Sequence, residues 1–429
     1  MTLRQYLTAA VIITATACSL SSCKKDKCTQ TVTYKTYVPV YMSYADMRNG
    51  VKVGAAQPLK NPGKIYLKGN YIFVNEINTG IHVIDNTNPS SPQNIAFITI
   101  PGNQDLAANG NTLYADSYID LLSFNISDVN NISLISRTQS ALPYNCSSNG
   151  YYADSTLGVV TSWQLKLVTQ KVNNDCGNQQ VTYPMVDGFQ NTTSTSGAGT
   201  SVAVNTNTPG VGGSTARFTI ASNTLYIVDN SSLRVFDVTN AGSPQHINTQ
   251  NIGWSIETIF PYNNHLFIGS NSGFYIFDIS SPQNPVYVSE YSHITACDPV
   301  TVDSHYAYFT LSGDAPCHKD VNELDIVDIS NLQSPSLVIT VPMTDPKGIG
   351  VDAQTLFICD SRDGLKVYNT SNINNVANSL VAHFSNINSF DVIPYNKHLI
   401  MIGSSGLYQY DYSNLQNITL LSSIPIVAN

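Results

Sequence analysis

The chain has 429 residues, which is enough for two or three ordinary domains or for one large all-β domain. Charged residues make up only 11% of it, against about a quarter in a typical globular protein, and the net charge is −9. A nucleic-acid partner is therefore excluded, because no basic stripe exists to neutralise phosphates. The abundance of uncharged polar residues and of Tyr suits β-structure outside the cytoplasm.

The N-terminal segment predicts export and a lipid anchor. Arg4 precedes an apolar run, Leu7–Ala17, that is too short to span a bilayer comfortably. The run ends in Leu20-Ser21-Ser22-Cys23, which resembles the bacterial lipobox, where the signal is cut before the Cys and that Cys is lipidated. We therefore expect a signal peptide over residues 1–22, lipidation of Cys23 and a flexible tether over 23–33. An ordinary secretory signal or a short anchor helix is the alternative.

Export and lipidation predict a protein held at the outer membrane or cell surface, in contact with the membrane through its lipid. Residues 34–63 then form a lead-in to the main domain at 64–429. Within and just before this lead-in, Thr31–Met42 alternates apolar and polar residues and predicts a strand. That strand either adds to the edge of a sheet or serves as a connecting segment.

One β-unit recurs from Lys64 onward. Its phrase is clearest at Glu323–Ser330, where a half-buried strand pattern runs into a Ser/Asn/Pro turn, and it returns at Gly273–Ser280 and Leu233–Thr239. An Asp or Asn ends this third strand of each unit, and successive copies lie 40, 112, 41, 50, 41 and 42 residues apart. These residues are Asp85, Asn125, Asp237, Asp278, Asp328, Asn369 and Asp411.

A period near forty residues is what four short strands and their turns require, which is the period of a propeller blade. The fourth unit, for example, is read as strands at Glu257–Tyr262, His265–Ser270, Gly273–Ser280 and Pro285–Tyr291. The sequence thus predicts an all-β fold, a β-propeller of seven four-stranded antiparallel blades. The long gap is interpreted as an insertion at about 138–213, with a strand near Trp163–Val168 and a flexible loop at Asn191–Gly213, although it leaves room for another blade.

The repeated phrase resembles the LVIVD repeat of exported bacterial proteins. Leu324-Asp325-Ile326-Val327-Asp328 carries the likeness most clearly, and Asn125 and Asn369 depart from it where the motif has Asp. The resemblance implies a β-propeller and a lipoprotein, and it implies little about activity. Phrases typical of the openings of that family's blades stand at Asn61–Lys64, Ala216–Phe218, Cys297–Val300 and Pro346–Gly348.

Antiparallel strands place the start of strand 1, the end of strand 2 and the connections between blades on one rim. If strand 1 is innermost, its first residues surround the mouth of a central channel, and every blade has a charged residue there. Mixed charges could bind a polar ligand or ion, or they could form a closed ring of ion pairs that holds the blades together. These candidate binding residues are Lys64, Asp105, Arg217, Glu257, Asp298, Lys347 and Asp391.

The same rim should receive further polar and aromatic side chains, and such a concentration of loops is how propellers build binding surfaces. Cysteine positions predict two disulfides, Cys297 with Cys317 and Cys146 with Cys176, and a buried thiol at Cys359. The additional rim residues are Glu76, Asp116, Asp229, Asp360, Trp254 and His293.

Catalytic and metal-binding motifs are absent from the sequence: it contains no G-x-S-x-G, H-E-x-x-H, C-x-x-C or glycine-rich phosphate loop. We therefore predict no catalytic residue, no metal site and no implied cofactor. The favoured function is a binding or protein-interaction module that takes an envelope protein or a polar small ligand on its rim. The alternatives are a propeller hydrolase or lyase that uses carboxylates at the channel mouth, and a structural component of an envelope complex.

Overall fold

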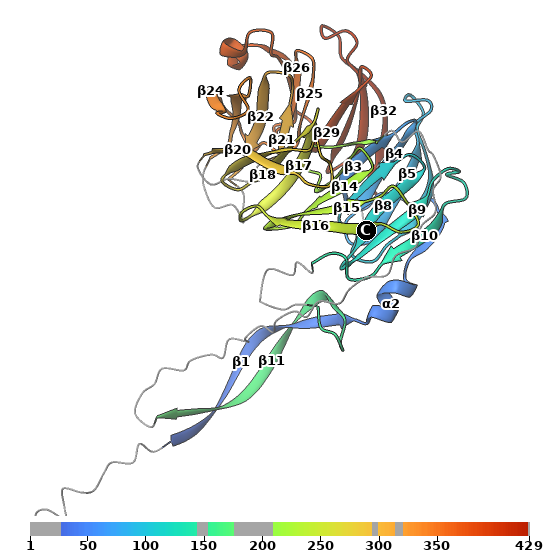
Figure 1. Cartoon of the computed structure of the whole chain (residues 1–429), viewed down its shortest axis with the longest axis vertical. Coiled ribbons are helices and arrows are strands. Elements are labelled where there is room, and N and C mark those ends of the chain that lie inside the picture. The colour runs from blue at the N-terminus through green and yellow to red at the C-terminus, as the bar shows by residue number, and fades with distance from the viewer. Residues whose placement is uncertain (1–26, 144–152, 176–208, 294–298, 314–320, 428–429) are drawn as a thin grey trace, which may run out of the picture. The chain divides into compact units, whose positions relative to one another are not determined.

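The computed structural model describes residues 27–143, 153–175, 209–293, 299–313 and 321–427. The chain forms two compact units. The smaller unit contains most of a two-stranded ribbon made of β1 (Lys27–Met42) and β11 (Val159–Asp175) (Figure 1). In this ribbon the hydroxyl oxygens of Thr33 and Thr169 lie 3.0 Å apart. The strand predicted at Thr31–Met42 therefore exists, and its partner is a strand of the insertion that includes Trp163–Val168.

The larger unit is a seven-bladed β-propeller, as the repeat period predicts. Within each blade the four strands follow chain order, and the first strand of every blade contacts the first strands of both neighbouring blades. The first strands are therefore innermost. Among the described residues the 112-residue gap adds no eighth blade.

The strand bounds follow the predicted units closely, and in blade 4 they differ from the predicted bounds by no more than two residues at each end. Blade 1 comprises β3 (Pro62–Lys68), β4 (Tyr71–Glu76), β5 (Gly80–Asp85) and β6 (Gln93–Thr99). Blade 2 comprises β7 (Leu106–Asn109), β8 (Thr112–Ser117), β9 (Asp120–Asn125) and β10 (Ser133–Thr138). Blade 3 comprises β13 (Phe218–Ala221), β14 (Thr224–Val228), β15 (Ser232–Asp237) and β16 (Gln245–Asn251).

The remaining four blades complete the ring. Blade 4 comprises β17 (Ile256–Tyr262), β18 (His265–Ser270), β19 (Gly273–Asp278) and β20 (Val286–Ser292). Blade 5 comprises β21 (Val300–Val302), β22 (Tyr306–Leu311), β23 (Glu323–Asp328) and β24 (Ser336–Pro342). Blade 6 comprises β25 (Ile349–Asp352), β26 (Thr355–Cys359), β27 (Leu365–Asn369) and β28 (Leu380–Phe384). Blade 7 comprises β29 (Ser389–Tyr395), β30 (His398–Gly403), β31 (Gly406–Asp411) and β32 (Thr419–Pro425).

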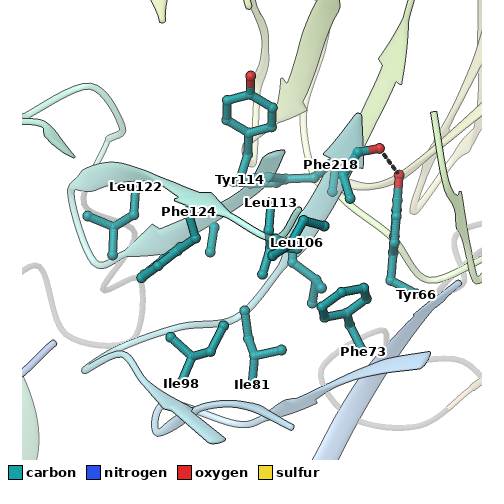
Figure 2. Close-up of a cluster of buried hydrophobic side chains, with 14 of the residues drawn as sticks. Tyr66, Phe73, Ile81, Ile98, Leu106, Leu113, Tyr114, Leu122, Phe124 and Phe218 are labelled. Atoms are coloured by element: carbon teal, nitrogen blue, oxygen red, sulfur yellow. Dashed lines mark hydrogen bonds between the residues drawn. The ribbon is translucent and has the colours of Figure 1, made fainter. Parts of the chain in front are cut away.

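Packing between blades explains the apolar pattern of the strands. Second strands such as β18 are largely apolar, and every residue of β18 after His265 is buried, because both faces of each sheet pack against neighbouring blades. Fourth strands are outermost and partly exposed. Figure 2 shows one apolar cluster in which Phe73, Leu113 and Phe218 come from blades 1, 2 and 3, and in which the hydroxyl of Tyr66 donates to the carbonyl of Ala108 at 3.2 Å. Burial of these apolar and aromatic side chains between blades stabilises the packing of neighbouring blades.

The Asp or Asn at the end of each third strand forms a turn. In all seven blades its Oδ1 accepts the backbone N–H of the second residue after it, at 2.7 to 2.9 Å. Asn125 and Asn369 replace Asp without loss of this hydrogen bond, because the turn needs only a side-chain oxygen as acceptor. In blade 5 the hydrogen bonds from the backbone and side chain of Ser330 lower the pKa of Asp328. The repeated phrase is therefore scaffold.

The ring closes where the C-terminal blade and the residues after it meet blade 1 and the residues just before it. The backbone N–H of Val427 donates to the carbonyl of Leu59 at 2.8 Å, and the Gln409 amide donates to Oδ1 of Asn86 at 2.7 Å. The lead-in adds α2 (Tyr44–Asn49) and β2 (Lys52–Ala55), and β2 pairs with β6 at the outer edge of blade 1. None of the described helices, α2 and the 3₁₀ turn η1 (Ile373–Asn378), is long and apolar enough to cross a membrane.

One part of the predicted flexible loop is ordered structure. Residues 191–208 lie outside the described residues, but β12 (Val211–Gly212) pairs antiparallel with Leu67 and Tyr66 of β3. The inner edge of β3 carries backbone groups that need partners, and this short strand supplies them. The prediction of a loop up to Gly213 was therefore wrong for this stretch.

Candidate functional site at the centre and rim of the propeller

The centre of the propeller is occupied by the chain itself. We call Pro209–Ala216 the central segment. Gly210 donates its N–H to Ala108 of blade 2, and Gly213 donates to Ile65 of blade 1. The segment also bonds to Ile259 of blade 4, Ile349 of blade 6 and Asp391 of blade 7 before it enters blade 3. Only a segment that crosses the middle of the ring can reach five other blades, so these residues fill the space where a channel was expected.

Three of the predicted channel-mouth residues meet beside the central segment. The Lys64 ammonium lies 2.5 Å from Oδ2 of Asp105, and this oxygen also accepts the backbone N–H of Arg217. Nε of Arg217 in turn donates to the backbone carbonyl of Glu257 at 3.1 Å. Burial lowers the pKa of Lys64, opposed by the neighbouring charge of Asp105. One ion pair and two hydrogen bonds thus link the openings of blades 1 to 4, each blade to the next.

Asp391 of blade 7 binds the central segment. Its carboxylate accepts the Thr215 hydroxyl at 2.8 Å, the backbone N–H of Val392 at 2.9 Å and the Ser214 hydroxyl at 3.4 Å. Burial raises its pKa to about 6, against which the bond from Thr215 and the charge of Lys64 act. A side chain at Gly213 would collide with this carboxylate.

The other predicted residues lie apart from this cluster or outside the described residues. The ammonium of Lys347 is 2.9 Å from Oδ1 of Asp345 and donates to the Ser312 hydroxyl at 3.0 Å. Sequence reasoning missed Asp345 as its partner. Outside the described residues lie Asp298, the lipidation candidate Cys23 and the disulfide candidates Cys146, Cys176, Cys297 and Cys317.

A pocket of about 80 Å³ lies between blades 2 and 3 on the predicted rim. Asp105 and Arg217 enter it from the starts of first strands, and Asp116 and Asp229 enter it from the ends of second strands. The alternating direction of successive strands was enough to predict from the sequence that all four residues lie on one rim. Other lining residues, which sequence reasoning missed, include Gln104, Tyr118, Leu142, Phe218 and Ile227.

The residues just before β7 bind one carboxylate oxygen of Asp116. Its Oδ1 accepts the backbone N–H groups of Gln104 and Asp105 at 2.9 and 3.0 Å, and the Asn103 amide at 2.8 Å. Burial nevertheless raises the pKa of Asp116 to about 6. Asp229 is engaged differently, by the Ser231 and Ser232 N–H groups and by Arg234, whose Nε lies 3.2 Å from Oδ2.

A second pocket, of about 310 Å³, lies beside blade 1. Glu76 accepts the backbone N–H groups of Lys60 and Asn61 there, and its Oε2 is 2.9 Å from Nε2 of the buried His82. Burial lowers the pKa of His82, and this effect is opposed by the hydrogen bond from the imidazole to the Glu76 carboxylate. The predicted rim residue Glu76 therefore supports the lead-in of the propeller.

The remaining rim candidates differ in exposure. Trp254 is 80% exposed on the connection between blades 3 and 4. His293 stacks on Phe309 with ring centroids 5.3 Å apart. Asp360 is fully buried and binds the Lys366 ammonium at 2.6 Å. Within the described ranges, no group of three or more His, Cys, Asp or Glu side chains could hold a metal ion.

The central segment is the main feature that sequence reasoning missed. Its one local signal is the pair Gly212-Gly213 just before the opening of blade 3. Adjacent glycines often mark a close approach of the backbone to another group, here the Asp391 carboxylate.

Comparison with known proteins supports the repeat and the fold. The LVIVD repeat matches residues 62–96, 258–293 and 317–342. These segments fall in blades 1, 4 and 5, and the resemblance read from the sequence is confirmed. No curated protein matches the chain.

Solved structures similar to this chain include the periplasmic gluconolactonase PpgL of Pseudomonas aeruginosa, with 10% identity, a TM-score of 0.52 and coverage of 85% of this chain and 97% of that one. A protein of unknown function from Desulfotomaculum acetoxidans has 12% identity, a TM-score of 0.50 and coverage of 83% and 95%. BamB from Moraxella catarrhalis has 9% identity, a TM-score of 0.47 and coverage of 89% and 97%. Identities this low show the fold and no more.

Proposed function

We propose that this chain, an LVIVD-repeat β-propeller, is a lipid-anchored protein of the cell envelope that binds a partner protein through its loop-rich rim. The observation that carries the proposal is Trp254, whose side chain is 80% exposed to solvent. A partner that covers this ring recovers the free energy of its burial, and Trp is enriched among the residues that dominate protein–protein binding.

The backbone around Trp254 is fixed to the neighbouring blade. Ile252 donates its N–H to the carbonyl of Ser231 at 2.9 Å, and Ile256 donates to the carbonyl of Asn230 at 3.0 Å. The exposed ring therefore stands on a connection held on both sides by the turn of blade 3. A side chain whose backbone is already ordered loses less conformational entropy on binding than one on a free loop.

The sequence supports the proposed lipid anchor and the proposed location in the cell envelope. Leu20-Ser21-Ser22-Cys23 would place a lipid at the start of the mature chain, and the residues up to 33 would serve as a tether. A protein anchored in this way meets other envelope proteins, and its uncharged polar surface suits that setting.

The test is capture of partners from native membranes by the lipidated, full-length protein. Wild type is compared with Trp254→Ala and with Val286→Ser, a change at a 61% exposed site on the outermost strand of blade 4. A specific partner should be retained by wild type and by the Val286 variant, and reduced about tenfold or more by loss of the Trp. Equal capture by all three proteins would refute a role for this rim.

A further inference from the structure

Asp116 and Arg217 carry opposite charges into the pocket between blades 2 and 3 without touching each other. Asp116 belongs to β8 of blade 2, and Arg217 directly precedes β13 of blade 3. Both side chains line the pocket, and no ion pair joins them. Opposite charges at a shared cavity normally pair directly unless something else holds them apart. Here the backbone of blade 2 holds Asp116, and the backbone carbonyl of Glu257 in blade 4 holds the side chain of Arg217.

Each of the two residues has hydrogen-bonding capacity left over. The Oδ1 atom of Asp116 accepts three bonds, whereas no group of the described residues donates to its Oδ2. Arg217 uses its backbone N–H on Asp105 and its Nε on Glu257. Within the described ranges, Nη1 and Nη2 of this guanidinium have no hydrogen-bond partner. The pocket thus offers one acceptor and a pair of donors.

The remaining charges of the pocket are already neutralised. Asp105 pairs with Lys64 at 2.5 Å, and Asp229 pairs with Arg234 at 3.2 Å. One negative and one positive group are therefore left facing the cavity. The apolar part of the lining includes the buried residues Phe218, Ile227, Val228 and Leu142.

Size restricts what could bind. A cavity of about 80 Å³ holds only a few heavy atoms, since one water needs roughly 10–15 Å³ on the same measure. The part of a ligand held inside the pocket must therefore be small, and a ligand with a single charge would leave one pocket charge desolvated and unpaired. A compact molecule with both charges satisfies each restriction.

We propose that this pocket binds a small zwitterion with an ammonium and a carboxylate group, as free α-amino acids have. The ammonium group donates to Oδ2 of Asp116, and the carboxylate accepts the paired N–H groups of Arg217, whose planar fork suits a carboxylate. A short side chain lies on Phe218 and Ile227. This inference goes beyond the proposed function, because it requires neither a partner protein nor Trp254.

Binding should depend on the ionisation of Asp116. Burial raises the pKa of this carboxyl group to about 6, and an ammonium group binds only its ionised form. The charged groups near it are Asp105, Lys64, Arg217 and Asp229. Affinity should therefore increase from pH 5 to pH 7, as the carboxyl group of Asp116 loses its proton.

The experiment is calorimetric titration of the full-length protein at pH 7.5 with L-alanine. Propionate and ethylamine serve as probes that each lack one of the two charges. We expect alanine to bind and each single-charge probe to bind about tenfold or more weakly, as for the loss of a charged hydrogen bond. Asp116→Asn and Arg217→Gln should each weaken alanine binding by a similar factor, whereas Val286→Ser and Trp254→Ala should leave it unchanged.

Two results would overturn the inference. The first is the absence of binding of alanine, glycine and serine at about 10 mM, a concentration that would reveal even a millimolar site. The second is binding of propionate or ethylamine as tightly as alanine, which is measured on the wild type alone and so does not depend on the folding of a variant. Neither result affects capture of a partner through Trp254, so failure of this inference is distinguishable from failure of the proposed function.

Discussion

The ammonium nitrogen of Lys64 lies 2.5 Å from Oδ2 of Asp105, and that oxygen also accepts the backbone N–H of Arg217. A single buried carboxylate therefore joins the openings of blades 1, 2 and 3. Lys64 and Asp105 are 41 positions apart, one repeat, so the link connects equivalent points of neighbouring blades.

Replacement of Lys64 by Met should destabilise the propeller by about 3 kcal/mol, because Asp105 would remain buried without its counter-ion. The double variant K64M/D105N should recover part of this loss, since the Asn oxygen can still accept the Arg217 N–H. Urea unfolding of the wild type, both single variants and the double variant measures the coupling. A loss below about 0.5 kcal/mol for K64M would mean that the pair behaves as a surface pair.

Gly213→Ala should cost about 1–3 kcal/mol, because the added methyl group collides with the Asp391 carboxylate and must displace it or the central segment. The matched control is Gly212→Ala, whose methyl group would approach Ala216 Cβ to 3.2 Å and needs only a small shift. Thermal unfolding should separate the two variants clearly. Similar midpoints for both would show that the central segment moves freely away from Asp391.

The buried carboxyl of Asp391 should make stability depend on pH. Burial raises its pKa to about 6 in the folded protein, from an ordinary value of 3.8, so the folded state binds more protons between these values. Stability from this group is present at low pH and is lost as pH rises through 6. The difference in unfolding free energy between wild type and Asp391→Asn should therefore fall between pH 4 and 6, by at most about 1.4 kcal/mol per pH unit.

Chemical unfolding of both proteins at several pH values checks this expectation. Asp116 also has a raised pKa, but it is present in both proteins and its contribution cancels in the difference. A constant difference across the range would contradict the assignment.

The turn residue of the fifth repeat offers a test of the scaffold. Asp328→Asn should have little effect, because Asn already occupies the equivalent positions 125 and 369 and makes the same bond. Asp328→Ala removes the bond to the Ser330 N–H, and at this exposed turn the loss should be at most about 1 kcal/mol. Equal stability of the Ala and Asn variants in denaturant titrations would show that the side-chain oxygen is dispensable.

The repeat and its turns could be predicted because their causes are local. Asp328 bonds to a residue two positions away, and the alternation of β23 repeats wherever the same environment recurs. The direction of successive strands also predicted that Asp116 and Arg217 share a rim. That they line one pocket without pairing depends on how two blades pack, and no pattern within either blade determines it.

The centre of the molecule could not be predicted for the same reason. Three partners of the central segment, Ile65, Ile349 and Asp391, lie more than a hundred residues away from it in the chain, on either side. Composition pointed to a loop because this stretch is rich in Gly, Ser and Thr. In the structure those small residues are what allows the backbone to pass between first strands.

The central segment also affects how the protein can be made. Repeat proteins whose units contact only their neighbours can fold progressively as they leave the ribosome. Here Thr215 bonds to Asp391, a residue 176 positions later, which at cellular rates of synthesis follows after roughly ten to thirty-five seconds. Until then the central segment lacks its contact with blade 7, so a nascent chain stalled before blade 7 would expose an incomplete centre to chaperones and proteases.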